Sequence, residues 1–286
     1  MLYKKLVSAL FIFVIITISA FALGCTSQSP STTPTTTVTP TAAPISGSIN
    51  VTGSTSVGPY AGELATMFEQ KYPGTMVSVI QVGSGPGIQA VINGTTDIGM
   101  SSRALTSAES AKGLTSWKIC DDGIAIIVNN NVSLTNLSSS QIKDIFAGNI
   151  TNWQQVGGSN TPIMVVTREV GSGTRDGFQT LIMGSTNITT GAITLSSTGA
   201  VITYVAGDPN TIGYISFGSM ENSVKALEVD GVTPSITTIK DKSYKLQRPF
   251  LYVTNGIPNA IAQAFIDYTL GTYGQAYLAK QNLVTL

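Results

Sequence analysis

The fold is decided by residues 49–100, which read INVTGSTSVGPYAGELATMFEQKYPGTMVSVIQVGSGPGIQAVINGTTDIGM. This stretch predicts three short strands, at residues 49–52, 77–82 and 97–100. Between the first two strands, apolar residues recur at helical spacing over residues 57–68 until Tyr72-Pro73 ends the helix, and a second helix is expected at residues 88–92. This strand–helix order predicts an α/β protein with a mostly parallel sheet that is covered by helices on both faces.

The same alternation continues toward the C-terminus. Four further strands are expected, at residues 124–128, 163–166, 212–217 and 250–253. Three further helices are expected, starting at Gln141, at residues 178–183 and at residues 260–270. The run 124–128 is apolar throughout, which is typical of a strand that is buried on both faces. Two such βα-rich stretches within 286 residues predict two α/β lobes.

Three loops rich in Gly, Ser and Thr each lie between an expected strand and an expected helix. They are residues 53–59 (GSTSVGP), 83–87 (GSGPG) and 171–177 (GSGTRDG). Such loops present backbone N–H groups and hydroxyls at the N-terminus of a helix, where an anion is favoured. For any one of them, an ordinary helix cap is the simpler explanation. Three in one chain favour an anion-binding site.

An arginine accompanies the third loop. Arg168 lies four residues before Ser172, where its planar guanidinium could hold two oxygens of an oxyanion. The alternative is a salt bridge to Glu169 or Asp176. The loops also lack nucleotide-binding signatures, because none reads G-x-G-x-x-G and none ends in the Lys-Ser/Thr of a P-loop. The pattern therefore favours a site that holds an anion and performs no chemistry on it.

The composition excludes several classes of function. The chain has no histidine, so it cannot build a Ser–His–Asp triad, a Cys–His nucleophile or a His-ligated zinc site. Its 15 basic and 15 acidic residues argue against a nucleic-acid partner, and setting aside Lys4 and Lys5 leaves 13 basic residues and a net charge of −2. We expect no enzyme activity, no cofactor and no metal. Cys120 is expected to be a small buried hydrophobic residue.

Residues 1–25 have the pattern of an export signal. Lys4 and Lys5 precede an apolar run at residues 6–24, and Ala22-Leu23-Gly24-Cys25 resembles a lipobox, in which the cysteine is lipidated after cleavage. The alternative is an uncleaved signal anchor, since the run is just long enough to span a bilayer. Residues 26–46 are almost purely Ser, Thr, Pro, Ala and Gln, which predicts a flexible linker. In both cases the body is expected on the extracytoplasmic face of the membrane, tethered to it.

Six short motifs occur in a defined order along the chain. They are GSTS at residues 53–56, GSG at 83–85, DIGMSSR at 97–103, IFAGNITNW at 145–153, REVGSGTR at 168–175 and IGY at 212–214. Together they resemble the PstS family, the phosphate-binding components of phosphate ABC transporters. The likeness runs from about Gly47 to the C-terminus, and the motifs are specific jointly although each alone is weak.

The resemblance implies a two-lobed periplasmic-binding-protein fold of type II-like topology, with the ligand cleft between the lobes. It implies that residues 47–128 form the first lobe, that residues 129–249 form the second, and that residues 250–286 return to the first. Matched position by position, it implies that phosphate is bound by eight residues: Thr55, Ser56, Ser84 and Ser102 of the first lobe, and Arg168, Ser172, Gly173 and Thr174 of the second.

One position departs from the family pattern. Many members have an Asp where Ser102 stands, and that acceptor-only carboxylate receives the proton of hydrogen phosphate, which sulfate lacks. With Ser102, discrimination against sulfate must come from elsewhere, such as Asp122, or be weaker. The alternative for Asp122 is a solvated turn residue. Arg103 is left open between a second ligand and a surface ion pair.

The resemblance thus implies extracytoplasmic, high-affinity binding of inorganic phosphate and its delivery to the transmembrane permease subunits of an ABC transporter, by a monomer held at the membrane through lipidated Cys25. The alternative of the same fold is a binding protein for another tetrahedral oxyanion, such as sulfate, molybdate or tungstate. A surface phosphatase and a non-transport role, such as an adhesin or a phosphate sensor, are weaker alternatives.

Overall fold

The computed structural model describes residues 45–286. The predicted signal peptide 1–25 with Cys25, and linker residues 26–44, lie outside the described residues. Among the helices within residues 45–286, none has both the length and the apolar character needed to cross a membrane.

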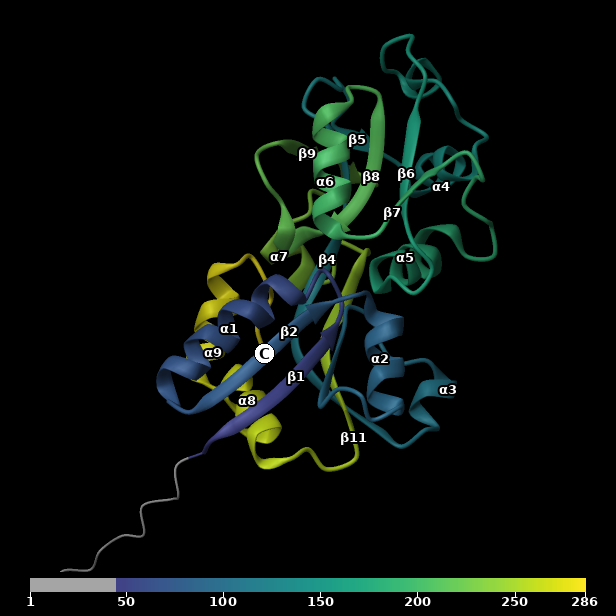
Figure 1. Cartoon of the computed structure of the whole chain (residues 1–286). Coiled ribbons are helices and arrows are strands. Elements are labelled where there is room, and N and C mark those ends of the chain that lie inside the picture. Colours follow the sequence, from purple (N-terminus) through teal and green to yellow (C-terminus); the bar gives the residue numbers. More distant parts are fainter. Residues whose placement is uncertain (1–44) are drawn as a thin grey trace, which may run out of the picture. The chain divides into compact units, whose positions relative to one another are not determined.

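The first lobe contains the β-α-β-α-β stretch predicted from the sequence. Its first elements are β1 (Gly47–Gly53), α1 (Gly58–Lys71), β2 (Thr75–Gln81), α2 (Ser84–Ile92), β3 (Ile98–Ser101) and α3 (Ser107–Ser110). Strand β1 lies between β2 and β3 and is parallel to both. The C-terminal elements β11 (Gln247–Asn255), α8 (Ala260–Leu270) and α9 (Thr272–Lys280) pack with these elements, and β11 pairs with β3. Helices α1, α8 and α9 lie on one side of these strands, and α2 lies on the other (Figure 1).

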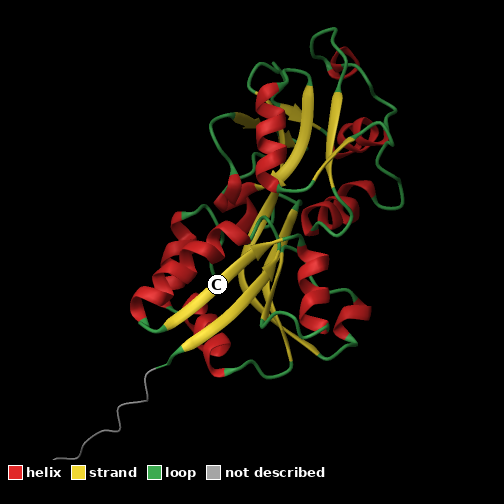
Figure 2. Ribbon diagram, in the orientation of Figure 1, coloured by secondary structure: helices red, strands yellow, loops and turns green. Residues whose placement is uncertain are grey.

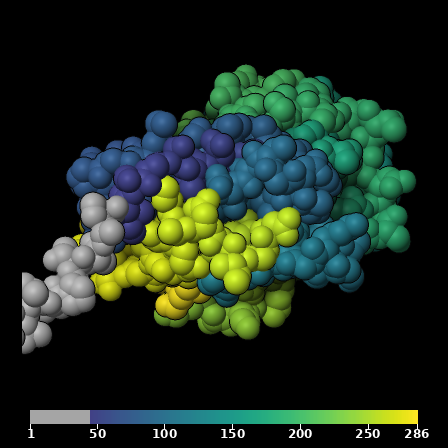
Figure 3. Space-filling view, turned by 60° about the horizontal axis from the view of Figure 1, so that its bottom comes forward, coloured from purple at the N-terminus to yellow at the C-terminus, as the bar shows by residue number. Residues whose placement is uncertain are grey.

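The core of the first lobe joins the two ends of the described chain. Phe68 of α1 packs edge-on against Phe265 and Tyr268 of α8 at centroid distances of 5.4 and 5.7 Å. The same buried cluster contains Ile49 of β1 and Leu278 of α9. Figure 3 shows the C-terminal residues, in yellow, lying against the first strands and helices, in purple and blue. This core is therefore built from both ends of the described residues.

Strand β4 (Leu114–Asn129) connects the two lobes. Residues 114–123 pair antiparallel with β11, and from Ile124 onward β4 pairs instead with β8 (Thr211–Ser216). The result is one nine-stranded sheet in the order β2-β1-β3-β11-β4-β8-β6-β7, with β9 attached to β4. Helices flank this sheet on both sides (Figure 2).

The second lobe is built on the other half of β4. Its remaining elements are β5 (Asn136–Leu137), α4 (Ser139–Ala147), β6 (Met164–Arg168), α5 (Gly173–Phe178), the π-helix η2 (Gln179–Met183), β7 (Ile193–Leu195), α6 (Thr198–Gly207), β9 (Val224–Ala226), β10 (Glu228–Val229), α7 (Ile236–Lys240) and the short 3-10 turns η1 (Trp153–Val156) and η3 (Phe217–Ser219). Side chains of β4 alternate between two cores: Ile124 and Ile126 pack with α4, whereas Ala125 and Ile127 pack with α6. The prediction that residues 124–128 are buried on both faces is confirmed.

The α/β fold and the predicted strands are confirmed, with some differences. The sheet is mixed, because β4 and β11 run antiparallel to their neighbours while β1–β3 and β6–β8 provide parallel pairs. Helices α2 and α5 begin at Ser84 and Gly173, inside loops whose Gly, Ser and Pro residues gave no periodic signal. Helix α6 and the first half of β4 were not predicted, because neither segment has a clear apolar period.

Candidate functional site

The loop after β1 contributes two buried hydroxyls. Ser54 Oγ accepts hydrogen bonds from the backbone N–H groups of Ser56 and Val57 at 3.2 and 3.3 Å, which holds the turn at the start of α1. Gly53 has φ +151°, and a Cβ there would collide with the backbone of Met100 in β3. The backbone can therefore leave β1 in close contact with β3, and Thr55 and Ser56, which follow, are buried.

The loops after β2 and β3 meet each other. Gly83, at φ +103°, precedes Ser84, the first residue of α2. Ser84 Oγ accepts a hydrogen bond from the backbone N–H of Ser102 at 3.0 Å and lies 3.3 Å from the Ser102 hydroxyl. Both serines are buried. The two positions predicted from separate motifs thus form one pair of hydroxyls.

The loop after β6 brings the second lobe against this pair. Ser172 caps α5 by accepting a hydrogen bond from the backbone N–H of Arg175 at 3.3 Å. A Cβ on Gly173 would collide with the hydroxyl oxygens of Ser84 and Ser102, so a glycine is required for this approach. Gly85 N–H also donates to the Gly171 carbonyl oxygen at 2.9 Å across the two lobes.

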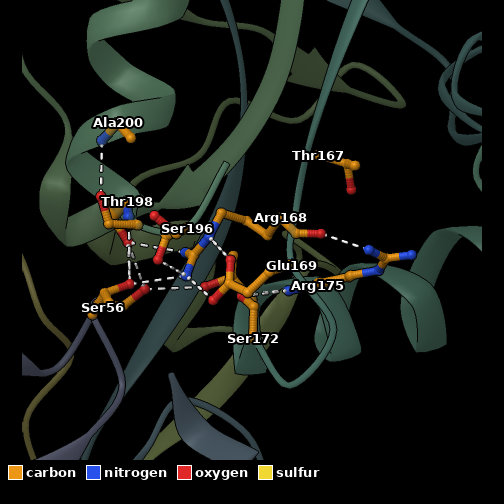
Figure 4. A network of polar contacts seen from close by, with 12 residues as sticks. Ser56, Thr167, Arg168, Glu169, Ser172, Arg175, Ser196, Thr198 and Ala200 are labelled. Carbon is orange, nitrogen blue, oxygen red and sulfur yellow. Dashed lines mark hydrogen bonds and ion pairs between the residues drawn. The ribbon is translucent and has the colours of Figure 1, made fainter. Parts of the chain in front are cut away.

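Four hydroxyls from both lobes form a buried cluster, which we call the hydroxyl cluster: Thr55, Ser56, Thr174 and Thr198. Ser56 Oγ lies 3.1 Å from Thr198 Oγ1 (Figure 4). Ser56 Oγ also lies 3.0 Å from Thr174 Oγ1, and Thr55 Oγ1 lies 3.4 Å from Thr198 Oγ1. Each of the four residues is at most 6% exposed. Thr198 was missed by the sequence analysis, although Ser196-Ser197-Thr198-Gly199 has the composition of the other three loops, follows β7 and includes the first two residues of α6.

Arg168 reaches the hydroxyl cluster from the end of β6. Its Nη2 donates to Thr55 Oγ1 at 3.0 Å, and its Nη1 lies 3.4 Å from Thr198 Oγ1. Its Nε and Nη2 also donate to the two carboxylate oxygens of Glu169 at 2.8 Å. The salt bridge considered as the alternative therefore exists, but the Arg168 side chain is only 2% exposed. One edge of the guanidinium is held by Glu169, and the other faces the cluster.

The backbone around Arg168 is also held in position. Arg175 Nη1 donates to the Arg168 carbonyl oxygen at 2.6 Å, and the Arg168 N–H donates to the Tyr214 hydroxyl at 3.2 Å. Tyr214 lies 2.7 Å from Thr167 Oγ1 and stacks on Phe178, with the centroids 4.2 Å apart. Burial raises the pKa of Tyr214, so its hydroxyl stays neutral and can both donate and accept.

A second buried arginine was missed. Arg248 of β11 lies opposite Asp122 of β4, and its Nε and Nη2 donate to Asp122 Oδ2 at 3.2 and 3.0 Å. Its Nη2 also lies 3.4 Å from Ser56 Oγ. The Lys245-Leu246-Gln247-Arg248-Pro249 segment has no Gly/Ser loop beside it, so the sequence offered no signal for this position.

Asp122 is buried and hydrogen-bonded through both carboxylate oxygens, so it is not the solvated turn residue considered as the alternative. Its Oδ1 accepts from Ser216 Oγ at 2.9 Å and from the Gly218 N–H at 3.1 Å, while Oδ2 accepts from Arg248. Burial raises the pKa of its carboxyl, and the Arg248 guanidinium opposes that shift. With both oxygens occupied, Asp122 is poorly suited to accept a proton from a ligand.

Arg103 is held away from the hydroxyl cluster. Its Nη1 and Nη2 donate to the two carboxylate oxygens of Glu109 at 2.7 and 2.8 Å, and its Nε donates to Asp176 of α5 at 2.8 Å. The hydrogen bond from Arg103 lowers the pKa of Glu109 to about 2. The choice left open for Arg103 is therefore resolved in favour of an ion pair. Cys120 is buried as expected, and burial raises the pKa of its thiol.

The arrangement can bind an anion but has little means to transform one. Hydroxyls donate in any direction to which they rotate, and two guanidinium groups supply positive charge in a site closed to water. Of the eight residues predicted to bind phosphate, Arg168 contacts Thr55 and Ser56 contacts Thr174, and Thr198 joins these two pairs. Ser84, Ser102 and Gly173 form the adjoining contact, and Ser172 caps the helix beside it.

Comparison with known proteins agrees with this geometry. Residues 38–272 match the family model described as the PBP superfamily domain. The phosphate-binding protein PstS of Bacillus subtilis (strain 168) is 31% identical over 226 residues, covering 78% of this chain and 75% of that protein. Among solved structures, a phosphate ABC transporter substrate-binding protein from Clostridium perfringens with bound phosphate is 40% identical, with a TM-score of 0.82 and coverage of 84% of this chain and 100% of that one.

A second solved structure extends the comparison. An ABC-type phosphate transport receptor from Vibrio cholerae is 35% identical, with a TM-score of 0.71 and coverage of 83% of this chain and 100% of that one. The motif resemblance is thereby confirmed over nearly all of the described chain. The chain belongs to the PBP superfamily and, within it, to the PstS-type phosphate-binding proteins.

Proposed function

We propose that this protein binds inorganic phosphate outside the cytoplasm and delivers it to the permease of a phosphate ABC transporter. The observation that carries the proposal is the hydroxyl cluster with Arg168, in which a nearly fully buried guanidinium meets hydroxyls from two lobes. A buried anion loses its hydration, and such donors replace it. The similar proteins from B. subtilis, C. perfringens and V. cholerae, all described as phosphate-binding or phosphate-transporting, support the same ligand.

The ligand contacts are proposed for the eight residues carried over from the motifs. Thr55, Ser56, Ser84 and Ser102 would bind from the first lobe, and Arg168, Ser172, Gly173 and Thr174 from the second. We add Thr198, because its hydroxyl lies within 3.4 Å of Thr55, Ser56 and Arg168. Their burial and mutual hydrogen bonds support this assignment.

The lobe boundaries are proposed from the strands that cross between the lobes. The motifs suggested divisions after residue 128 and after residue 249. The change of partner along β4 supports a division slightly earlier, between Gly123 and Ile124, and the start of β11 at Gln247 supports the return crossing. Because ligands come from both lobes, phosphate should stabilise the closed form, and small-angle scattering should show a smaller radius of gyration with phosphate than without.

The attachment to the membrane is proposed from the sequence alone. Lipidation of Cys25 would hold the body at the extracytoplasmic surface as a monomer, within reach of its permease subunits. Cys25→Ser should then leave an unprocessed precursor, whereas a native protein that retains residues 1–24 would favour an uncleaved anchor. Co-purification with permease subunits tests the partner.

Calorimetric titration tests the ligand directly. Phosphate, sulfate and tungstate should be titrated in turn into protein freed of ligand by unfolding and refolding, and the released ligand should be identified by mass spectrometry. We expect phosphate to be released and to bind most tightly. Tighter binding of sulfate or tungstate would favour the alternative, which Ser102 in place of a carboxylate keeps open.

A further inference from the structure

Arg248 has a buried guanidinium nitrogen without a hydrogen-bond acceptor among the described residues. Its side chain is 3% exposed, and its Nη1 has no hydrogen-bond partner among the residues that the structure describes. A buried guanidinium nitrogen without an acceptor costs free energy, and such groups in native proteins usually have a specific reason. Arg248 Nη1 can therefore donate to an acceptor that is not part of the described residues.

Arg168 and Arg248 are held in the same way. In each, a carboxylate bonds Nε and Nη2, Glu169 for Arg168 and Asp122 for Arg248. In each, Nη2 also contacts a hydroxyl of the loop after β1, Thr55 for Arg168 and Ser56 for Arg248. The carboxylate therefore orients the guanidinium and leaves its remaining donors on the side of the hydroxyl cluster.

The two guanidinium groups are also close enough to affect each other. The pKa of Arg248 is lowered, chiefly by burial, and the positive charge of Arg168 adds to this effect. Each guanidinium is paired with one carboxylate, Glu169 or Asp122, on the edge that bears Nε. An anion bonded to the hydroxyl cluster would be attracted by both cations, and this attraction would offset their mutual repulsion.

We infer that Arg248 is a second guanidinium ligand of the bound anion, contributing its Nη1 from the strand at which the chain returns to the first lobe. The inference rests on the proposed function, because it concerns the same site. Two cations rather than one would then lie next to the hydroxyl cluster.

The test must separate a ligand from a structural ion pair. R248Q alone leaves Asp122 as a lone buried charge, so the principal variant is D122N/R248Q, in which the two amides can bond each other. D122N keeps the cation and removes only the carboxylate. The matched control is R103Q/D176N, which neutralises another arginine–aspartate pair between the lobes, outside the hydroxyl cluster. Thermal unfolding without phosphate shows whether each variant folds.

Calorimetric titration with inorganic phosphate gives the result. We expect D122N/R248Q to bind about tenfold to a hundredfold more weakly than the unmodified protein, as for loss of one charge-assisted bond. D122N should stay much closer to the unmodified protein, and R103Q/D176N should change affinity by no more than about twofold. The inference would be overturned if D122N/R248Q bound phosphate as tightly as the unmodified protein. It would also be overturned if D122N lost as much phosphate affinity as D122N/R248Q. No phosphate binding by the unmodified protein would instead overturn the proposed function.

Discussion

Arg168 and Arg103 both contact the opposite lobe, yet their surroundings differ. Arg168 has one carboxylate on one edge and neutral hydroxyls on the other, and its side chain is 2% exposed. Arg103 is bonded to two carboxylates, Glu109 and Asp176, and its side chain is 13% exposed. The first arrangement leaves donors free to serve an anion, whereas in the second two carboxylates outweigh one positive charge, which disfavours an anion. A position near a Gly/Ser loop is therefore not enough to identify an anion-binding arginine, because the hydrogen-bond partners of the guanidinium decide whether it can bind an anion.

Arg168→Ala should have the largest effect. Charge-assisted hydrogen bonds contribute about 1.5–3 kcal/mol each, and about 1.4 kcal/mol corresponds to tenfold in affinity, so phosphate binding should weaken by about a hundredfold or more. Arg168→Lys should recover only part of the loss, because an ammonium lacks the planar fork. Calorimetric titration measures both variants. Affinity equal to that of the unmodified protein would show that Arg168 resembles Arg103 after all.

Gly173→Ala should have the next largest effect. The added methyl group would collide with the hydroxyls of Ser84 and Ser102 and keep the lobes apart. Overpacking usually costs about 1–3 kcal/mol, which predicts a loss of phosphate affinity of about tenfold. Gly199→Ala is the matched control, because a Cβ there meets nothing within 4 Å. If the two variants bind equally well, the approach of Gly173 is not needed for binding.

Thr198→Val should have a smaller effect. It keeps the shape of the side chain and removes the hydroxyl that contacts Ser56, Thr55 and Arg168. Loss of one hydrogen bond from a hydroxyl to a charged ligand, about 1.5 kcal/mol at the lower end of the range, predicts phosphate affinity lower by up to about tenfold. Thr180→Val, on the more exposed side of η2, serves as the control. An unchanged affinity for Thr198→Val would exclude its hydroxyl from the site.

Arg103→Gln should change phosphate affinity least, by no more than about twofold, but it should change the response to acid. The pKa of Glu109 is lowered from 4.5 to about 2 in the folded protein, chiefly by the hydrogen bond from Arg103. The folded state therefore holds fewer protons on Glu109 than the unfolded state, and this contribution to stability is lost as pH falls from about 4.5 to 2.

Denaturant titrations across that pH range measure the contribution. The free energy of unfolding of Arg103→Gln should fall less steeply with acid than that of the unmodified protein. Parallel curves would show that Arg103 does not hold Glu109 in its charged form.

The local pattern of the sequence predicted most of the elements. Apolar periods identified α1 and α8, and strict apolar content identified the part of β4 that is buried between α4 and α6. The Gly/Ser/Thr loops and Arg168 were found because capping residues and glycines mark the ends of parallel strands, where such loops gather. These signals are local, so one sequence suffices to read them.

The partners of the charged residues were decided only by the tertiary structure. Arg248 and Asp122 are 126 positions apart and meet because β11 pairs antiparallel with β4, which no local pattern encodes. Thr198, at the start of α6, contacts Ser56 across 142 positions, and no local pattern encodes that contact either. The sequence by itself determined most of the longer α/β elements, the three anion-favouring loops and the arginine beside one of them. Long-range packing decides which arginines face the hydroxyls and which are paired with carboxylates only. The reason is that the partners of a buried charge come from residues far along the chain.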